Sequence, residues 1–361
     1  MDKPTYVTMP SLASLDKYTD MLQDVWKSGI LTHNGPFVQK MENMLCERLR
    51  VKNMVAVLNG TLALQMPFKA FKLCGEIITT PFSWVATCSS IIWENCVPVF
   101  VDIDPDTFNI DPQKLSDAIT HKTCGIMPVH VFSNPCDVEA IDTLAKKHNL
   151  KVIYDAAHSM FVNYKGKSVL EYGDVSATSF HATKIWNTGE GGGLITTNQE
   201  LHEQLKRIRF FGYNEKKDIV EDGFNGKMTE IHAVLGIVNL EIMDDVLARR
   251  KEIFEMYYQA FNSIDKITFQ KFDPEAYNYS YMPIVLDSEE TLLKIDEALK
   301  KKNIYARRYF YPSLNMVKTL GHYTHMPISE SLSHRILCLP SHQRLDDCVI
   351  ETIVNIIKEQ F

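Results

Sequence analysis

The feature that most constrains the fold of this chain is the alternation of short apolar runs with helical patterns through its first 200 residues. Most of the runs are near-continuously apolar, as expected for strands covered on both faces. Helical patterns between several of them indicate a largely parallel sheet wrapped by helices. The seven predicted strands are 54–60, 76–83, 97–104, 125–132, 151–157, 175–180 and 192–197.

One intervening helix is predicted over 134–148, with Asn134 as its N-cap and Pro135 at its first position. Near residue 229 the pattern changes, and apolar residues at helical spacing predict a helix running past residue 250. A helix of that length can join two domains. Beyond it we expect a strand at 280–286 and helices at 289–302 and 346–359.

These elements predict an α/β protein of two domains, which suits a length of 361 residues. The large domain is expected to span residues 1–240 and to hold the mainly parallel, seven-stranded sheet. The small C-terminal α+β domain is expected to span residues 241–361.

Composition excludes several classes of protein. Hydrophobic residues make up 45% of the chain and charged residues 23%, which is typical of a soluble globular protein and not of a disordered chain. The net charge of −7 argues against a nucleic-acid-binding surface. No apolar run reaches the roughly 18 residues of a membrane span, and the first residues lack a signal-peptide pattern. We expect a cytoplasmic protein that binds neither membrane nor nucleic acid.

The eight cysteines form no CxxC pair, so the sequence does not predict a zinc site, and we expect no bound metal. Several of them stand in apolar, strand-like runs. They are typical of small buried side chains in a reducing compartment.

Two ionisable residues stand at or just after the carboxyl ends of predicted strands, where ligands of open α/β sheets bind. Asp155 ends an apolar strand; it is either a turn or capping residue or a carboxylate that pairs with a cationic ligand group. Lys184 lies among Phe180, Ile185 and Trp186 and before a glycine-rich turn. Desolvation by such neighbours lowers the pKa of a lysine and makes its neutral amine available as a nucleophile.

Two further features follow other strands. Gly60 and Thr61 open a predicted helix, whose free N-terminal amides favour a phosphate, although Asn-Gly is also a plain turn. Trp84 can stack on a planar ring or pack in the core. A phosphate cradle, an aromatic plate, a carboxylate and a lysine are together the parts that hold pyridoxal 5′-phosphate (PLP).

The chain resembles the fold-type I, PLP-dependent sugar aminotransferases of the DegT/DnrJ/EryC1/StrS family over nearly its whole length. The motifs that carry the resemblance are NGTLAL (59–64), TTPFSWVAT (79–87), PVFVDID (98–104), DAAHS (155–159), SFHATK (179–184), GEGGG (189–193) and FNGKMTEIHA (224–233). Each motif alone is weak, and their ordered set is specific.

The resemblance implies catalytic roles for Lys184 and Asp155. Lys184 would form the Schiff base with the cofactor and shuttle the proton, and Asp155 would pair with the pyridine nitrogen. The resemblance also places Trp84 on the pyridine ring and His158 near the phenolic oxygen of the cofactor.

The implied phosphate ligands are Gly60, Thr61 and Ser179. Asn225 would reach the phosphate of the neighbouring subunit's cofactor, which requires a homodimer with shared active sites. The chain departs from the family pattern at Lys227, where an arginine is common, so a bidentate anion contact there is in doubt.

The implied reaction moves the amino group of L-glutamate to a nucleotide-linked keto sugar. SFHATK, with ARRYFYPSL at 306–314, looks most like enzymes that aminate C4 of dTDP-4-keto-6-deoxy-D-glucose. Their product, dTDP-4-amino-4,6-dideoxy-D-glucose, is a precursor of O-antigen sugars in lipopolysaccharide. The candidate substrate contacts are His181, Arg307, Arg308, Tyr309 and Tyr311, although the segment around the arginines could also be a surface strand.

Other functions stay open at this point. Within the family they are C3 amination and a GDP-linked 4-keto sugar. A PLP-dependent dehydratase would have histidine in place of Lys184, and a non-catalytic regulatory protein would usually have lost the lysine or the carboxylate. A nicotinamide-dependent oxidoreductase would need the GxGxxG fingerprint, which this sequence lacks because Leu194 occupies the place of the last glycine.

Overall fold

A seven-stranded sheet forms the centre of the molecule in the computed structural model, which describes residues 3–361. Its strand order is β2-β10-β9-β6-β5-β3-β4, and only β10 runs antiparallel to its neighbours. All seven strands predicted from the sequence are present, each shorter than expected. Their bounds are β2 Met54–Val57, β3 Glu76–Thr79, β4 Val97–Phe100, β5 Thr123–Met127, β6 Lys151–Asp155, β9 Val175–Ser179 and β10 Gly192–Ile195.

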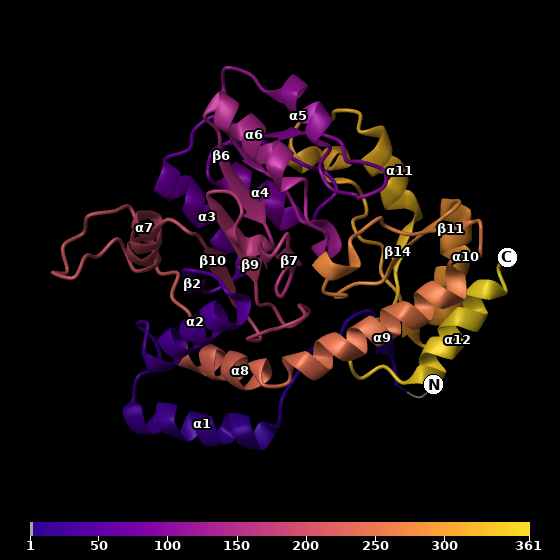
Figure 1. Cartoon of the computed structure of the whole chain (residues 1–361), viewed down its shortest axis with the longest axis horizontal. Coiled ribbons are helices and arrows are strands. Elements are labelled where there is room, and N and C mark those ends of the chain that lie inside the picture. Colours follow the sequence, from indigo (N-terminus) through magenta and orange to yellow (C-terminus); the bar gives the residue numbers. More distant parts are fainter. Residues whose placement is uncertain (1–2) are drawn as a thin grey trace.

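Helices cover both faces of the sheet, as the apolar strands predict (Figure 1). On one face Ile77 and Ile153 pack with helices α3 Gly60–Phe71, α4 Val85–Trp93 and α7 Gln199–Arg209. On the other face Ile78 and Val152 pack with α5 Pro112–Ala118 and α6 Val138–His148. Next to them, α2 Pro36–Leu49 and α8 Glu230–Leu240 cover β2 and β10, and α1 Leu15–Ser28 lies on α8. A hairpin of β7 Asn163–Tyr164 and β8 Lys167–Ser168 follows β6.

Helix α9, Met243–Phe261, runs obliquely from this sheet toward the C-terminal part of the chain (Figure 1). There a three-stranded antiparallel sheet joins β11 Ile267–Thr268, β12 Pro283–Leu286 and β14 Ile336–Cys338. Helices α10 Glu289–Lys300, α11 Pro327–Arg335 and α12 Asp347–Lys358 pack around it. The division of the chain at residue 240 stays a prediction.

The first strand is tied to this C-terminal part. β1, Thr5–Tyr6, pairs in parallel with β13, Ile304–Tyr305, and the rings of Tyr6 and Tyr305 stack 5.4 Å apart. The amide of Ser341 also donates a hydrogen bond to the carbonyl of Val7, at 3.2 Å. Within residues 3–361, no helix combines the length and the apolar character that crossing a bilayer requires.

Two helix predictions need correction. The helix expected over 134–148 begins at Val138, and its N-cap is Asp137, whose carboxylate accepts from the Ala140 amide at 3.0 Å. Pro135 keeps Asn134 extended, and the Asn134 side chain instead binds the carbonyls of Thr107 and Lys271.

The helix expected from 229 past 250 is two helices, because the chain turns at Glu241 and Ile242 between α8 and α9. No proline or glycine stands there, so the apolar pattern runs through the break. Sequence analysis predicts no element before residue 54 and therefore missed α1 and α2.

A buried carboxylate from α8 caps α2. Gly35 at the N-cap of α2 has no side chain to offer, and the amides of Phe37 and Val38 donate to Glu230 at 2.7 and 3.2 Å. Glu230 is fully buried, and a Cβ on Gly35 would lie 2.7 Å from its carboxyl carbon. Glu230 therefore caps the N-terminus of α2, a role that the side chain of the N-cap residue has in most helices.

We expect Glu230→Ala to destabilise the protein by about 2–4 kcal/mol, because two buried amides lose their acceptor. Glu230→Gln keeps one acceptor oxygen and should cost less. The measurement is the midpoint of urea unfolding, with Glu297→Gln on the exposed face of α10 as the control. Equal midpoints for Glu230→Ala and Glu297→Gln would contradict this capping role.

Candidate active site

A cavity of about 270 Å³ lies at the carboxyl ends of the parallel strands. Chain segments that follow β2, β3, β6 and β9 contribute its walls, together with residues from the C-terminal part of the chain. This is where an open α/β sheet binds its ligand. The predicted site residues that line it are Gly60, Thr61, Trp84, Asp155, His158, Ser179, His181, Lys184, Arg307 and Tyr309.

One end of the cavity has the form of a phosphate cradle. Asn59 is the N-cap of α3, and its side chain accepts from the Leu62 amide at 2.9 Å, which leaves the amides of Gly60 and Thr61 at the cavity wall. A Cβ on Gly60 would lie 2.9 Å from Cβ of Ser179. Only glycine allows this approach, which brings the Ser179 hydroxyl to the helix N-terminus. Backbone amides and hydroxyls in this arrangement bind a phosphate.

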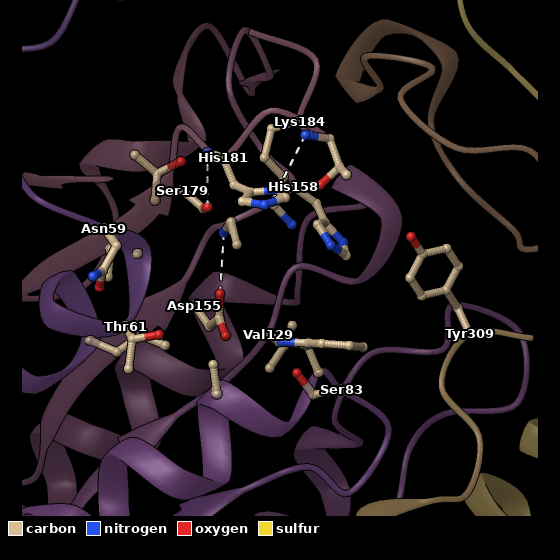
Figure 2. A pocket seen from close by; sticks show the side chains of 18 of the residues that line it. Asn59, Thr61, Ser83, Val129, Asp155, His158, Ser179, His181, Lys184 and Tyr309 are labelled. Atoms are coloured by element: carbon tan, nitrogen blue, oxygen red, sulfur yellow. Dashed lines mark hydrogen bonds between the residues drawn. The ribbon is translucent and has the colours of Figure 1, made fainter. Parts of the chain in front are cut away.

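Asp155 stands between this cradle and Tyr309 on the opposite wall (Figure 2). It is the last residue of β6 and is 5% exposed. One carboxylate oxygen accepts from the Thr87 hydroxyl at 2.6 Å, and the other accepts from the Ala157 amide at 3.2 Å. Burial raises the pKa of Asp155, and these donors and the Lys184 charge counter the rise. A cationic ring nitrogen at this carboxylate would hold it ionised.

Lys184 lies in the turn after β9, where its amide donates to the His181 carbonyl at 2.8 Å. The neighbours that the sequence singles out, Phe180, Ile185 and Trp186, are all buried. Burial lowers the pKa of Lys184 to about 8; the charge of Asp155 opposes the change, and Arg307 adds to it. Near that pH about half of the amine is neutral and able to act as a nucleophile.

The side wall combines an exposed ring with a cation. Trp84 precedes α4 and is 52% exposed on the cavity, so a flat ligand can stack on it. The Arg307 guanidinium lies 5.2 Å from the centre of the Trp84 ring and 4.7 Å from that of Tyr309. No ion pair holds the Arg307 side chain within residues 3–361, which leaves it available to an anionic ligand.

His158 is buried against Tyr281, with ring centres 4.5 Å apart. Burial, and then the nearby Lys184, lowers the pKa of His158 well below its usual range. The ring is therefore neutral, and its Nδ1 accepts from the Phe132 amide at 3.3 Å. His181 also lines the cavity; its Nδ1 lies 2.8 Å from the Thr183 hydroxyl, and its Nε2 lies 3.7 Å from Glu190.

Three of the predicted site residues do not line this cavity. Arg308 pairs with Glu289 at 2.5 Å, and its guanidinium lies 3.6 Å over the ring of Tyr311, so both side chains point away from the site. Asn225 is exposed and accepts from Nζ of Lys227 at 2.5 Å. Its predicted partner is the cofactor of a second subunit, so the role of Asn225 stays a prediction.

Two residues that sequence analysis did not single out belong to the site. Thr87 binds Asp155, and Tyr281 lines the cavity beside His158. Thr87 ends the motif TTPFSWVAT, eight residues after its start, where a helix returns it to the strand ends. Tyr281 stands at the start of an apolar run and carries no signal of its own.

Comparison with known proteins decides the family. The profile of the DegT/DnrJ/EryC1/StrS aminotransferase family matches residues 15–358. The chain belongs to this family. It is 42% identical to a dTDP-4-amino-4,6-dideoxy-D-glucose transaminase of Shigella dysenteriae, over 99% of this chain and all of that protein.

Two solved structures of sugar-processing proteins have the same fold as this chain. DesI, crystallised in the presence of its TDP-sugar product, matches with a TM-score of 0.94 and 28% identity, over 99% of this chain and 93% of that one. Spr1654 of Streptococcus pneumoniae in its PLP form matches with a TM-score of 0.88 and 26% identity, over 98% and 99% of the two chains. The fold-type I architecture and the PLP cofactor expected from the sequence are confirmed.

The cavity residues fit PLP. The glycine cradle at Gly60 suits its phosphate, and the exposed Trp84 face suits its ring. The buried Asp155 pairs with no arginine among residues 3–361 and suits its ring nitrogen. When bound, PLP supplies an electron sink for the carbon that loses or gains a proton. Burial gives Lys184 the depressed pKa that a proton carrier at this site would need, and Asp155 would hold the ring nitrogen in its protonated form.

Proposed function

We propose that this enzyme transfers the amino group of L-glutamate to C4 of dTDP-4-keto-6-deoxy-D-glucose and yields dTDP-4-amino-4,6-dideoxy-D-glucose. The observation that carries the proposal is the cavity that brings Lys184, Asp155 and the phosphate cradle together in a chain 42% identical to a transaminase of that name. The TDP-sugar product named for the DesI structure supports the same nucleotide.

In this proposal Lys184 is the general base and then the general acid for the proton transfers to and from carbon. Asp155 pairs with the ring nitrogen of the cofactor. Arg307 and Tyr309 contact the nucleotide sugar together with His181, since all three line the cavity. The product would supply sugar units for O-antigen. All eight cysteines are unpaired, which supports the reducing environment of the cytoplasm.

The test follows one half-reaction at a time. The PLP-loaded enzyme is bleached with L-glutamate, the excess is removed, and dTDP-4-keto-6-deoxy-D-glucose is added. We expect the visible absorbance to return within seconds. An enzyme that bleaches with glutamate but recovers its absorbance only with a C3-keto or a GDP-linked sugar would be an aminotransferase for that sugar, and the proposed substrate would be wrong.

We also propose a homodimer in which Asn225 of each subunit serves the partner's cofactor. Asn225 lies outside the cavity of its own chain, and large apolar side chains are exposed on α1 and on the loop that leads to Asn225, including Leu15, Trp26 and Ile219. Exposed apolar side chains of this size are typical of protein interfaces.

Complementation checks the shared site. Lys184→Ala and Asn225→Ala are each expected to be inactive as homodimers, while a mixed dimer regains one intact site. Random mixing should restore about a quarter of wild-type activity, because half of the dimers are mixed and each has one working site. Refolded mixtures that stay inactive, although native electrophoresis shows mixed dimers, would contradict the shared site.

A further inference from the structure

Two adjacent arginines near the cavity have different surroundings. Arg307 lines the cavity and packs against Trp84 and Tyr309. Arg308 lies outside it and pairs with Glu289. Alternation along an extended segment produces this division, because successive side chains point to opposite sides.

The outward side holds a cluster of Glu289, Arg308, Tyr311 and His334, which we call the Glu289 cluster. One Glu289 oxygen accepts from Arg308 at 2.5 Å, and the other lies 2.8 Å from Nδ1 of His334. The ring of Tyr311 lies 3.6 Å from the Arg308 guanidinium and meets His334 edge to face at 5.1 Å. Each member thus contacts at least two others.

This cluster joins α10, α11 and the segment that follows β13. Glu289 is the first residue of α10, and His334 is in the last turn of α11, just before β14. Arg308 and Tyr311 flank Tyr309, which is buried and packs edge to face with Tyr281 at 5.5 Å. The hydrogen bond from Arg308, followed by that from His334, lowers the pKa of Glu289, which is therefore ionised at neutral pH.

Main-chain hydrogen bonds do not by themselves determine which side chains of residues 307–311 face the cavity. Arg307 exchanges two main-chain hydrogen bonds with Cys338 of β14, at 3.0 and 2.8 Å. Beyond Arg307 no further bridge to β14 follows within the described chain, so the orientation of residues 308–311 depends on side-chain contacts. The ring of Tyr309, against which Arg307 packs, is in that stretch.

We propose that the Glu289 cluster is a positioning device for the nucleotide-sugar wall of the active site, acting through Arg308 on Tyr309 and Arg307. The proposal rests on the proposed function, in which Arg307 and Tyr309 contact the nucleotide sugar. Glu289 and Arg308 are positioning residues and do not touch substrate. This assigns Arg308 and Tyr311, which the sequence places among the sugar contacts, to a supporting role outside the cavity.

The test compares Glu289→Gln with wild type in steady-state transfer from L-glutamate to the keto sugar. We expect KM for the sugar to rise about fivefold, with kcat and KM for L-glutamate nearly unchanged, because a lost uniform binding contact raises KM alone. Asp296→Asn is the matched control: it removes an ion pair of the same 2.5 Å length, with Lys300, from the same helix. It should leave all three constants unchanged.

A double-mutant cycle with Arg307→Gln then distinguishes an effect that acts through Arg307 from a general loss of affinity for the sugar. If the cluster acts through Arg307, Glu289→Gln should add little to the KM of an Arg307→Gln enzyme, so the two effects are not multiplicative. Multiplicative effects would overturn the proposal, as would an unchanged sugar KM in Glu289→Gln or an equal rise in both KM values.

The wild-type enzyme keeps this result separate from the proposed function. Failure of wild type with dTDP-4-keto-6-deoxy-D-glucose refutes the proposed substrate, and the cycle is then run with the keto sugar that wild type accepts. If wild type accepts a sugar but the effects of Glu289→Gln and Arg307→Gln on its KM are multiplicative, the positioning role is refuted and the proposed function is not affected.

Discussion

Lys184→Ala is expected to lower turnover by at least about 10⁴-fold, because it removes both the amine that holds the cofactor and the group that moves the proton. The cavity, the phosphate cradle and Asp155 are unchanged by this substitution. The variant should therefore still bind PLP and trap it as a covalent adduct with the amino-sugar product, since no lysine is present to displace the sugar.

Absorbance and mass spectrometry after borohydride reduction measure that adduct. Wild-type enzyme reduced in the same way should carry the cofactor mass on a peptide containing Lys184. Lys301→Ala, at the exposed residue that caps the C-terminus of α10, is the control and should keep full activity. Turnover retained in Lys184→Ala would show that another group moves the proton.

Asp155→Asn should slow both half-reactions by about 10²- to 10³-fold, because an amide cannot hold the ring nitrogen in its protonated form. Both halves are affected since both need the electron sink. Thr87 and Ala157 donate to different carboxylate oxygens, so the single amide oxygen keeps one of these hydrogen bonds. The loss of one bond is small, so the fold should persist. Stopped-flow rates with L-glutamate and with the keto sugar measure the two halves, and unchanged rates would mean that another carboxylate serves the ring.

Thr87→Val tests the ionisation of Asp155 without replacing the carboxylate. Burial already raises the pKa of Asp155, and the Thr87 hydroxyl opposes the rise. Without the hydroxyl the pKa rises further, and the ionised carboxylate that the reaction needs disappears at a higher pH. The acidic limb of the pH–rate profile should therefore move to higher pH while the rate at pH 8 changes little. A limb that stays in place would separate Thr87 from the ionisation of Asp155.

The sheet and most of the cavity follow from the sequence because their signals are local. Apolar strand runs, glycines and the polar residues after each strand are contiguous in the chain, and parallel strands bring those ends together. Lys184 and Asp155 could be chosen for this reason. The break between α8 and α9 could not be predicted, because Ile242 continues the apolar period of α8 and only tertiary packing turns the chain there.

Residues 307–311 show a second limit of prediction from the sequence. Sequence similarity groups Arg307, Arg308, Tyr309 and Tyr311 as substrate contacts, but which of them face the cavity depends on partners far away in the chain. Glu289 and His334 draw Arg308 outward, and neither residue carries a sequence signal that links it to the site. Tyr281 was missed for the same reason, since its role depends on its distance from His158.

The pairing of β1 with β13 bears on how the enzyme is made. Residues 5–6 leave the ribosome long before their partners at 304–305. Contacts of such long sequence separation form late and slowly. β13 leads directly into the wall that carries Arg307, so the large sheet can assemble during synthesis before the residues of this wall have been made. A nascent enzyme should therefore be able to hold its cofactor before it can hold its sugar.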